Sequence, residues 1–187
     1  MPADRLLAYY RIMARNNAWS NHRLLRACAA LPPDEFTAPR VSFFPSLALT
    51  LNHLLLVDQY YLDALTGRPR AYQDLAMLYA TVAALQTGQS ASDRRLIALC
   101  DGLSDEQLDV AAQLVRDTGV LEECTERILA HLFLHQIHHR GQAHAMLAGT
   151  AVPPPQLDEF LLATDAPLRA ADLAALGFNE AQIWRSR

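Results

Sequence analysis

The stretch HLFLHQIHHRGQAH, residues 131–144, holds five of the chain's seven histidines and has the apolar spacing of a helix. Apolar residues recur around it at three- and four-residue steps, which predicts one long helix from about Glu122 to Leu147. The segment GTAVPPP follows and ends this helix, because proline removes a backbone donor and does not continue a helix. A long helix with one apolar face needs other helices to pack against, and the rest of the chain must supply them.

The same spacing predicts three further principal helices upstream, over about 4–30, 42–65 and 71–101. The sequence leaves undecided whether the third helix is broken around QTGQS (86–90). Ser104 and Gln107 form a capping-box pattern, and LVRDTGVL (114–121) could form a short hairpin around Asp117 to Gly119. One or two short helices, near 166–176 and 179–185, are expected in the C-terminal tail.

These elements predict an all-α fold: an antiparallel four-helix bundle followed by a short helical tail. A chain of 187 residues is long enough for one well-buried core and short for two. We therefore expect one domain over 1–187, with a core of about 4–150 and a C-terminal extension of about 151–187.

The composition excludes several classes of protein. The formal net charge of -4 provides no basic face, so we expect no nucleic-acid partner. All 16 basic residues are arginine, which excludes Schiff-base and phosphate-loop chemistry, since both need a lysine. The three cysteines form no CxxC pair. The N-terminus lacks a signal sequence, and FFPSLALTLNHLLLV (43–57) is too short to span a bilayer; we expect a cytoplasmic protein without membrane contact.

Most of the histidines share one face of the long helix. At about 100° per residue, His139 lies at about +40° from His135, His131 at about -40°, His138 at about -60° and Gln142 at about -20°. This face is also the apolar one, so it should point into the bundle. Burying several imidazoles without partners costs free energy, and protonated rings would repel one another. A metal ion that binds neutral imidazoles solves both problems; a metal-free polar network is the weaker alternative.

His135 and His139 are one helical turn apart, a spacing that lets two imidazoles bind one ion. A third ligand must come from another helix, and His53 is the single histidine on the inward face of the helix over 42–65. Taken alone, His53 is more typical of a core histidine with a hydrogen-bond partner. The facing HxxxH pair instead favours the interpretation that His53 is a metal ligand. His131 and His138 are candidates for residues that line the pocket or contact the metal-binding histidines.

The sequence lacks the motifs of several other kinds of metal site. There is no HExxH, no ExxH of the di-iron bundles and no CxxCH. A mononuclear three-histidine site remains, and three protein ligands leave a position open for water or substrate.

Some polar residues near these histidines have two interpretations. Asn17 and Asn21 lie on the inward face of the first helix, where they either line the pocket or make hydrogen bonds between helices. Gln142 is expected to orient a ligand imidazole. Arg140 is expected at the surface or a dimer contact, and Gly141 at a close helix approach.

Three segments carry a family resemblance: MARNNAWSNHRLLRACAALP (13–32), NHLLLVDQYYLDALTG (52–67) and HLFLHQIHHRGQ (131–142). Together they resemble the DinB family of damage-inducible proteins, within the DinB/YfiT-like superfamily. The resemblance implies an up-down-down-up bundle, often dimeric, with zinc or nickel on three histidines. Carried over to this chain, these are His53, His135 and His139. One departure is Leu134, where many members have asparagine.

The superfamily includes mycothiol-dependent maleylpyruvate isomerase and bacillithiol S-transferases, in which the metal is thought to ionise a low-molecular-weight thiol. The resemblance therefore implies a metal-dependent enzyme acting on a small molecule through a thiol or water, with S-transferase-like activity as the leading hypothesis. The alternatives are a metal-dependent hydrolase, and a non-enzymatic metal-binding stress-response or dimeric interaction protein. A homodimer is expected.

Overall fold

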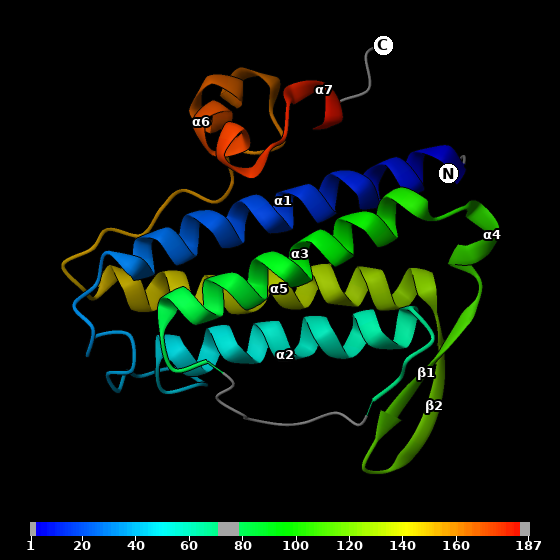
Figure 1. The fold of residues 1–187 in the computed structure, drawn as a ribbon, viewed down its shortest axis with the longest axis horizontal. Coiled ribbons are helices and arrows are strands. Elements are labelled where there is room, and N and C mark those ends of the chain that lie inside the picture. The colour runs from blue at the N-terminus through cyan, green and yellow to red at the C-terminus, as the bar shows by residue number, and fades with distance from the viewer. Residues whose placement is uncertain (1–2, 71–78, 184–187) are drawn as a thin grey trace.

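The computed structural model describes residues 3–70 and 79–183, and the chain over these residues is mostly helical (Figure 1). Its elements in chain order are α1 (Ala3–Ala29), α2 (Leu47–Leu65), α3 (Val82–Gly102), α4 (Asp105–Leu108), β1 (Ala111–Arg116), β2 (Gly119–Cys124), α5 (Thr125–Ala148), a 3-10 turn (Ala163–Asp165), α6 (Ala166–Leu176) and α7 (Glu180–Ile183). No helix among these described segments is long and apolar enough to cross a membrane.

α2 begins five residues later than the apolar pattern predicts. Ser46 caps the helix, because its hydroxyl accepts a hydrogen bond from the backbone N–H of Leu49 at 3.1 Å. Pro45 directly precedes this cap, and a residue before proline is biased away from helical backbone. The predicted start at residue 42 is therefore wrong, and residues 41–46 form an irregular segment.

α3 begins at Val82, after a cap by the Thr81 hydroxyl, and it continues without a break through residues 86–90. The first residues of the helix predicted over 71–101 lie outside the described part of the chain. Gly88 packs tightly against residues outside α3: a Cβ there would be 2.9 Å from the ring of Tyr79 and 3.0 Å from Leu55. A glycine at this position permits the close approach.

The hairpin over 114–121 is present, and it corrects the all-α prediction. β1 and β2 pair antiparallel, with Arg116 opposite Gly119 across the two-residue loop of Asp117 and Thr118. Gly119 has a φ of 122°, which a residue without a side chain adopts freely. The capping box at Ser104 and Gln107 is confirmed at the start of α4. The fold is thus mostly helical with one small two-stranded antiparallel sheet.

The four long helices lie side by side. α1 packs along α3, and α2 packs along both α5 and α3. Figure 1 shows that α1 and α5 run in one direction and that α2 and α3 run in the other. The β1–β2 hairpin extends from the end where α2 finishes and α5 begins.

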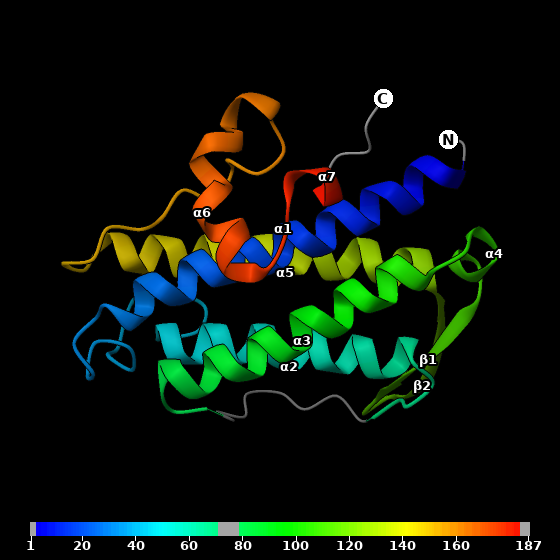
Figure 2. The ribbon, with the colours of Figure 1, turned by 45° about the horizontal axis from the view of Figure 1, so that its top comes forward.

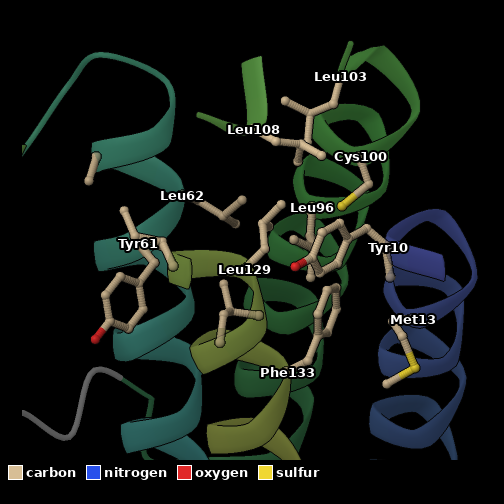
Figure 3. Close-up of a cluster of buried hydrophobic side chains, with 14 of the residues drawn as sticks. Tyr10, Met13, Tyr61, Leu62, Leu96, Cys100, Leu103, Leu108, Leu129 and Phe133 are labelled. Carbon is tan, nitrogen blue, oxygen red and sulfur yellow. The ribbon is translucent and has the colours of Figure 1, made fainter. Parts of the chain in front are cut away.

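Two apolar clusters fill the two ends of this helical assembly. One contains Tyr10, Leu62, Leu96 and Phe133, and Figure 3 shows these side chains converging from all four long helices. The other surrounds Leu24, Leu51, Leu85 and Leu147 in the opposite half of each helix. Between them, the same helices contribute buried polar residues, which we call the polar layer: Asn17, Asn21, His53, Asp58, Gln89, Asp93, Gln136, His139 and Arg140.

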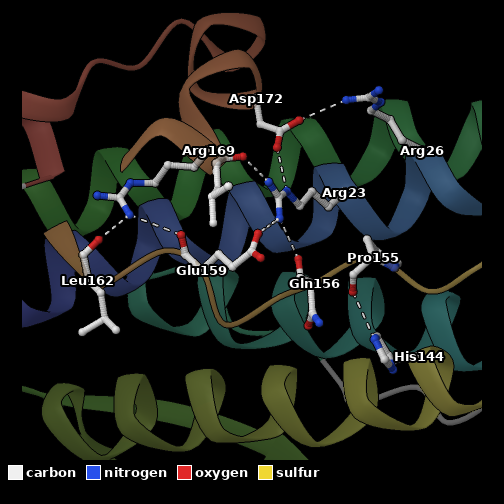
Figure 4. A network of polar contacts seen from close by, with 10 residues as sticks. Arg23, Arg26, His144, Pro155, Gln156, Glu159, Leu162, Arg169 and Asp172 are labelled. Atoms are coloured by element: carbon white, nitrogen blue, oxygen red, sulfur yellow. Dashed lines mark hydrogen bonds and ion pairs between the residues drawn. The ribbon is translucent and has the colours of Figure 1, made fainter. Parts of the chain in front are cut away.

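The C-terminal segment packs across the outside of α1 (Figure 2). Phe160 is fully buried, and its ring centroid lies 5.4 Å from that of Trp19. Arg23 donates to Asp172 at 2.6 Å and to Glu159 at 2.8 Å, as Figure 4 shows. α6 has the predicted bounds, and α7 (Glu180–Ile183) lies within the range predicted for it, of which residues 184–185 are outside the described part of the chain.

Candidate metal centre

Three histidines from two helices meet in the polar layer. His53 comes from the middle of α2, while His135 and His139 come from consecutive turns of α5. One ring nitrogen from each lies within 4.8 Å of the others. Nε2 of His53 lies 3.0 Å from Nε2 of His135. Helical spacing brings the two α5 rings together, and packing of α2 against α5 adds the third.

The chemistry of this donor set fits a transition metal. Nitrogens bound to one zinc ion at about 2.0–2.1 Å in tetrahedral geometry lie roughly 3.3 Å from each other. The three histidines approach that arrangement, so small side-chain movements would complete it. Three histidines could therefore bind one metal ion here.

Burial keeps the rings of His135 and His139 in the neutral form that binds metals. Desolvation, followed by the charges of His139 and His53, lowers the pKa of His135 to about 3. Desolvation also lowers the pKa of His139, against the opposing effect of the hydrogen bond that His139 makes to Gln142. Both imidazoles are thus neutral at pH 7, with lone pairs to offer a cation.

Gln142 contacts the cluster from one turn further along α5. Its Oε1 lies 2.8 Å from Nδ1 of His139 and accepts a hydrogen bond from that N–H. The lone pair of Nε2 is then free to bind a metal. The Gln142 amide nitrogen lies 3.2 Å from Nε2 of His138. Gln142 therefore holds His139 in one orientation and one tautomer.

The other histidines of the helix lie at the edge of the cluster or away from it. His138 is exposed, with its ring 4.9 Å from that of His139. His131 is also exposed and lies 6.1 Å from the ring of His135. His144 faces away, and its Nε2 lies 3.0 Å from the carbonyl oxygen of Pro155 (Figure 4). The three-histidine group includes none of these.

Phe44 is a site residue that the sequence reasoning missed. Its ring is 4.4 Å from that of His53 and 5.5 Å from that of His139, and only 4% of the residue is exposed. It belongs to the irregular segment before α2, where the incorrect helix start hid its position. The sequence signal that could have placed Phe44 near the start of α2 was a hydrophobic residue directly before Pro45 and the capping residue Ser46. Phe44 shields the histidines from water on this side.

Asn17 and Asn21 take part in hydrogen bonds between helices. Both donate to Oδ1 of Asp93 on α3, at 3.2 and 3.0 Å. Both also accept from Arg140 on α5. Of the two interpretations, the structure supports inter-helix hydrogen bonding.

Arg140 and Gly141 are not where the sequence predicted them. Arg140 is 4% exposed and donates to Gln136 as well as to the two asparagines, so the expected surface or dimer contact is wrong. Asp58 accepts from Gln89 and Gln136 within the same polar layer. Among the described residues, a Cβ on Gly141 would meet no atom within 4 Å outside the backbone of its own helix, so this glycine marks no close helix approach.

Fold and site together define a mostly helical protein whose long helices converge on a histidine cluster able to hold one metal ion. The chain belongs to the DinB family, whose model matches residues 5–170, and the resemblance noted in the sequence is thereby confirmed. This match continues past the helical core into α6.

Two curated proteins of Bacillus subtilis are similar to the chain. The uncharacterized protein YizA is 30% identical over 118 residues, which are 62% of this chain and 71% of YizA. Protein DinB is 25% identical over 162 residues, which are 79% of this chain and 91% of that protein.

Proposed function

We propose that this protein is a divalent-metal-dependent enzyme of the S-transferase type, with His53, His135 and His139 as the metal ligands. The observation that carries the proposal is the convergence of three imidazole nitrogens within 4.8 Å. A divalent cation bound there would acidify a coordinated thiol or water, so that it ionises near neutral pH. Zinc or nickel is the proposed metal, and a low-molecular-weight thiol is the proposed cosubstrate.

The surrounding residues have supporting roles in this proposal. Gln142 orients His139 through Nδ1, and burial keeps His135 neutral. Phe44 limits access of bulk water to one side of the cluster. His131 borders a cavity of about 450 Å³ that Tyr61 and the β1–β2 hairpin also line, and this cavity is the proposed entry for a small-molecule substrate. A water nucleophile in the same place would make the protein a hydrolase, which remains the alternative reaction.

The remaining proposals concern the whole chain. We propose a single domain in which α1, α2, α3 and α5 form an up-down-down-up bundle, with residues 151–187 as an extension; the helix directions and contacts support it. Leu134 and Ile137 are more than half exposed on the outward face of α5, which supports a homodimer. Three free cysteines support a cytoplasmic location, since this is a reducing compartment.

The metal is tested first, by elemental analysis of protein purified without a histidine tag. We expect about one zinc or nickel per chain in the wild type and a loss of most of it in His53→Ala and His139→Ala. His144→Ala is the matched control, because it removes an imidazole from the same helix outside the cluster. Equal metal content in all four proteins would contradict the site.

The reaction is tested with a panel of low-molecular-weight thiols against a model electrophile, using the metal-loaded protein. We expect thiol consumption well above that of His139→Ala, which shares the fold and lacks a ligand. Ester hydrolysis without thiol consumption would favour the hydrolase. A loaded protein no faster than His139→Ala with every thiol and ester would contradict an enzymatic role.

A further inference from the structure

A cavity of about 230 Å³ lies between α1, α3 and the end of α6, and none of the three clustered histidines lines it. α1 contributes Asn21 and His22 to its walls, and α3 contributes Asp93. Gln86, Ser90 and Arg94 of α3 are further polar lining residues, and the apolar ones include Leu25, Ile97, Leu176 and Phe178. The cavity therefore has both polar and apolar walls, which suits a ligand with one polar end and one apolar end.

Asp93 provides the charged group in this polar region. It is 5% exposed, and its three hydrogen bonds, from Asn17, Asn21 and Gln89, all end on Oδ1. Within the described residues, Oδ2 receives no hydrogen bond. This oxygen is not fully buried, so it is open to a donor from outside the protein. Since Asp93 lines the cavity, a donor that enters the cavity can reach this carboxylate.

The charges behind Asp93 favour a cationic donor. The polar layer contains Arg140, Asp58 and Asp93, all buried, and so has one more negative than positive formal charge. Burial raises the pKa of Asp93 to about 6 and that of Asp58, which also faces Asp93, to about 7. At pH 7 Asp93 is thus mostly ionised and Asp58 about half protonated, so part of this negative charge is left for a cation.

The neighbouring side chains suit the same kind of ligand. Desolvation lowers the pKa of His22, so its imidazole is neutral at pH 7. Its Nε2 lies 3.9 Å from the Asp172 carboxylate, beyond hydrogen-bond distance. Arg94 also lines the cavity, but it is an exposed residue, so solvent screens its charge more than that of the buried Asp93.

We propose that this cavity is a second ligand site, separate from the histidine cluster, which binds a small primary ammonium ion with a short apolar chain. The ammonium group donates to Asp93, and the alkyl chain lies against Ile97, Leu176 and Phe178. The site depends on the C-terminal segment, because that segment closes one side of the cavity.

The test is titration of the metal-loaded wild type with n-propylammonium, followed by calorimetry and by NMR shifts on α1 and α3. Neutral n-propanol and anionic butyrate are the matched probes. We expect saturable binding of the ammonium ion only, weakened at least tenfold in Asp93→Asn. His53→Ala should bind it as the wild type does, which separates this site from the metal ligands.

Asp93→Asn could lose stability, so a second pair of variants tests the cavity itself. Ala175 lines the cavity and its neighbour Ala174 does not, although both are exposed on α6. Ala175→Phe should abolish binding by filling the cavity, while Ala174→Phe should leave binding unchanged. Absence of saturable binding to the wild type, equal binding of propanol, or unchanged binding in Ala175→Phe would overturn the proposal.

Discussion

At the scale of single residues, Gln142 shows how one amide can prepare a ligand. The Nδ1 atom of His139 has its partner in Gln142 at 2.8 Å. The corresponding atom of His135 is buried and has no hydrogen-bond partner within the described part of the chain. Since an imidazole held through its outer nitrogen keeps its orientation and basicity, His139 is the better prepared of these two donors.

Replacing Gln142 with leucine should therefore lower metal affinity by about 10- to 100-fold while leaving the three histidines in place. Competition with a chromophoric chelator would measure the change. Gln113→Leu, on the exposed hairpin, is the matched control and should keep wild-type affinity. Equal affinity in Gln142→Leu would show that this hydrogen bond does not contribute.

Asp58 is the residue through which pH should act on stability. Desolvation, and then the charge of Asp93, raises its pKa from 3.8 to about 7. Between about pH 4 and 7, the folded state therefore binds more protons at this carboxyl than the unfolded state does. The contribution of Asp58 to the free energy of unfolding is thus present at low pH and falls as pH rises through this window.

Asp58→Asn removes this titration and keeps a similar side-chain volume. The free energy of unfolding of the variant, minus that of the wild type, should rise by up to a few kcal/mol from pH 4 to pH 7.5. Urea unfolding at several pH values measures it. Since the difference cancels the groups that do not interact with Asp58, a flat difference would contradict a raised pKa at Asp58.

At the scale of secondary-structure elements, two helix glycines have opposite surroundings. Gly88 lies inside α3, where a Cβ would be 2.9 Å from the ring of Tyr79. Gly141 lies inside α5, where, among the described residues, a Cβ would meet no atom within 4 Å outside the backbone of its own helix. Helix propensity alone favours alanine at both positions, so packing decides which glycine the fold requires.

Gly141→Ala should therefore raise the free energy of unfolding by about 0.5–1 kcal/mol, since it adds helix propensity without a clash. Gly88→Ala should instead lower it by about 1–3 kcal/mol, because Tyr79 and Leu55 must move. Chemical denaturation of both variants measures the two effects. Stabilisation by both substitutions would show that α3 can move away from α2 at little cost.

At the scale of the whole molecule, the C-terminal segment is joined to the helical assembly by burial as well as by charge. Trp19 and Phe160 are both fully buried, with Leu173 and Ile183 in the same apolar cluster. Arg169 is fully buried too and donates to the backbone oxygens of Glu159 and Leu162 (Figure 4). Such contacts favour unfolding of the segment together with α1, as a single domain would.

Phe160→Ala should lower the free energy of unfolding by about 3–5 kcal/mol, with one unfolding transition retained. Leu162→Ala is the control: this side chain is 62% exposed, so the change should stay within about 0.5 kcal/mol. Calorimetry and circular dichroism follow the transition. A separate low-temperature transition for the C-terminal segment, with the helices unaffected, would contradict the single domain.

Local pattern was sufficient for much of the fold. Apolar spacing predicted α1, α5 and α6 to within a few residues, and the capping box at Ser104 was read correctly. Apolar spacing gave the wrong start for α2, because the apolar run FFPSL includes a proline, and the residue before a proline disfavours helical backbone. Spacing also predicted the HxxxH pair, because His135 and His139 are neighbours on one helix whatever surrounds them.

The sequence by itself determined which residues share a helix face, since that depends only on the helical repeat. Tertiary structure alone decided which faces meet: His53 lies beside His135, Phe44 covers both helices at the cluster, and Arg140 lies inside. The physical reason is that a buried charge is acceptable only where other elements supply partners. For Arg140 these are the asparagines of α1, which are more than a hundred residues away in the chain.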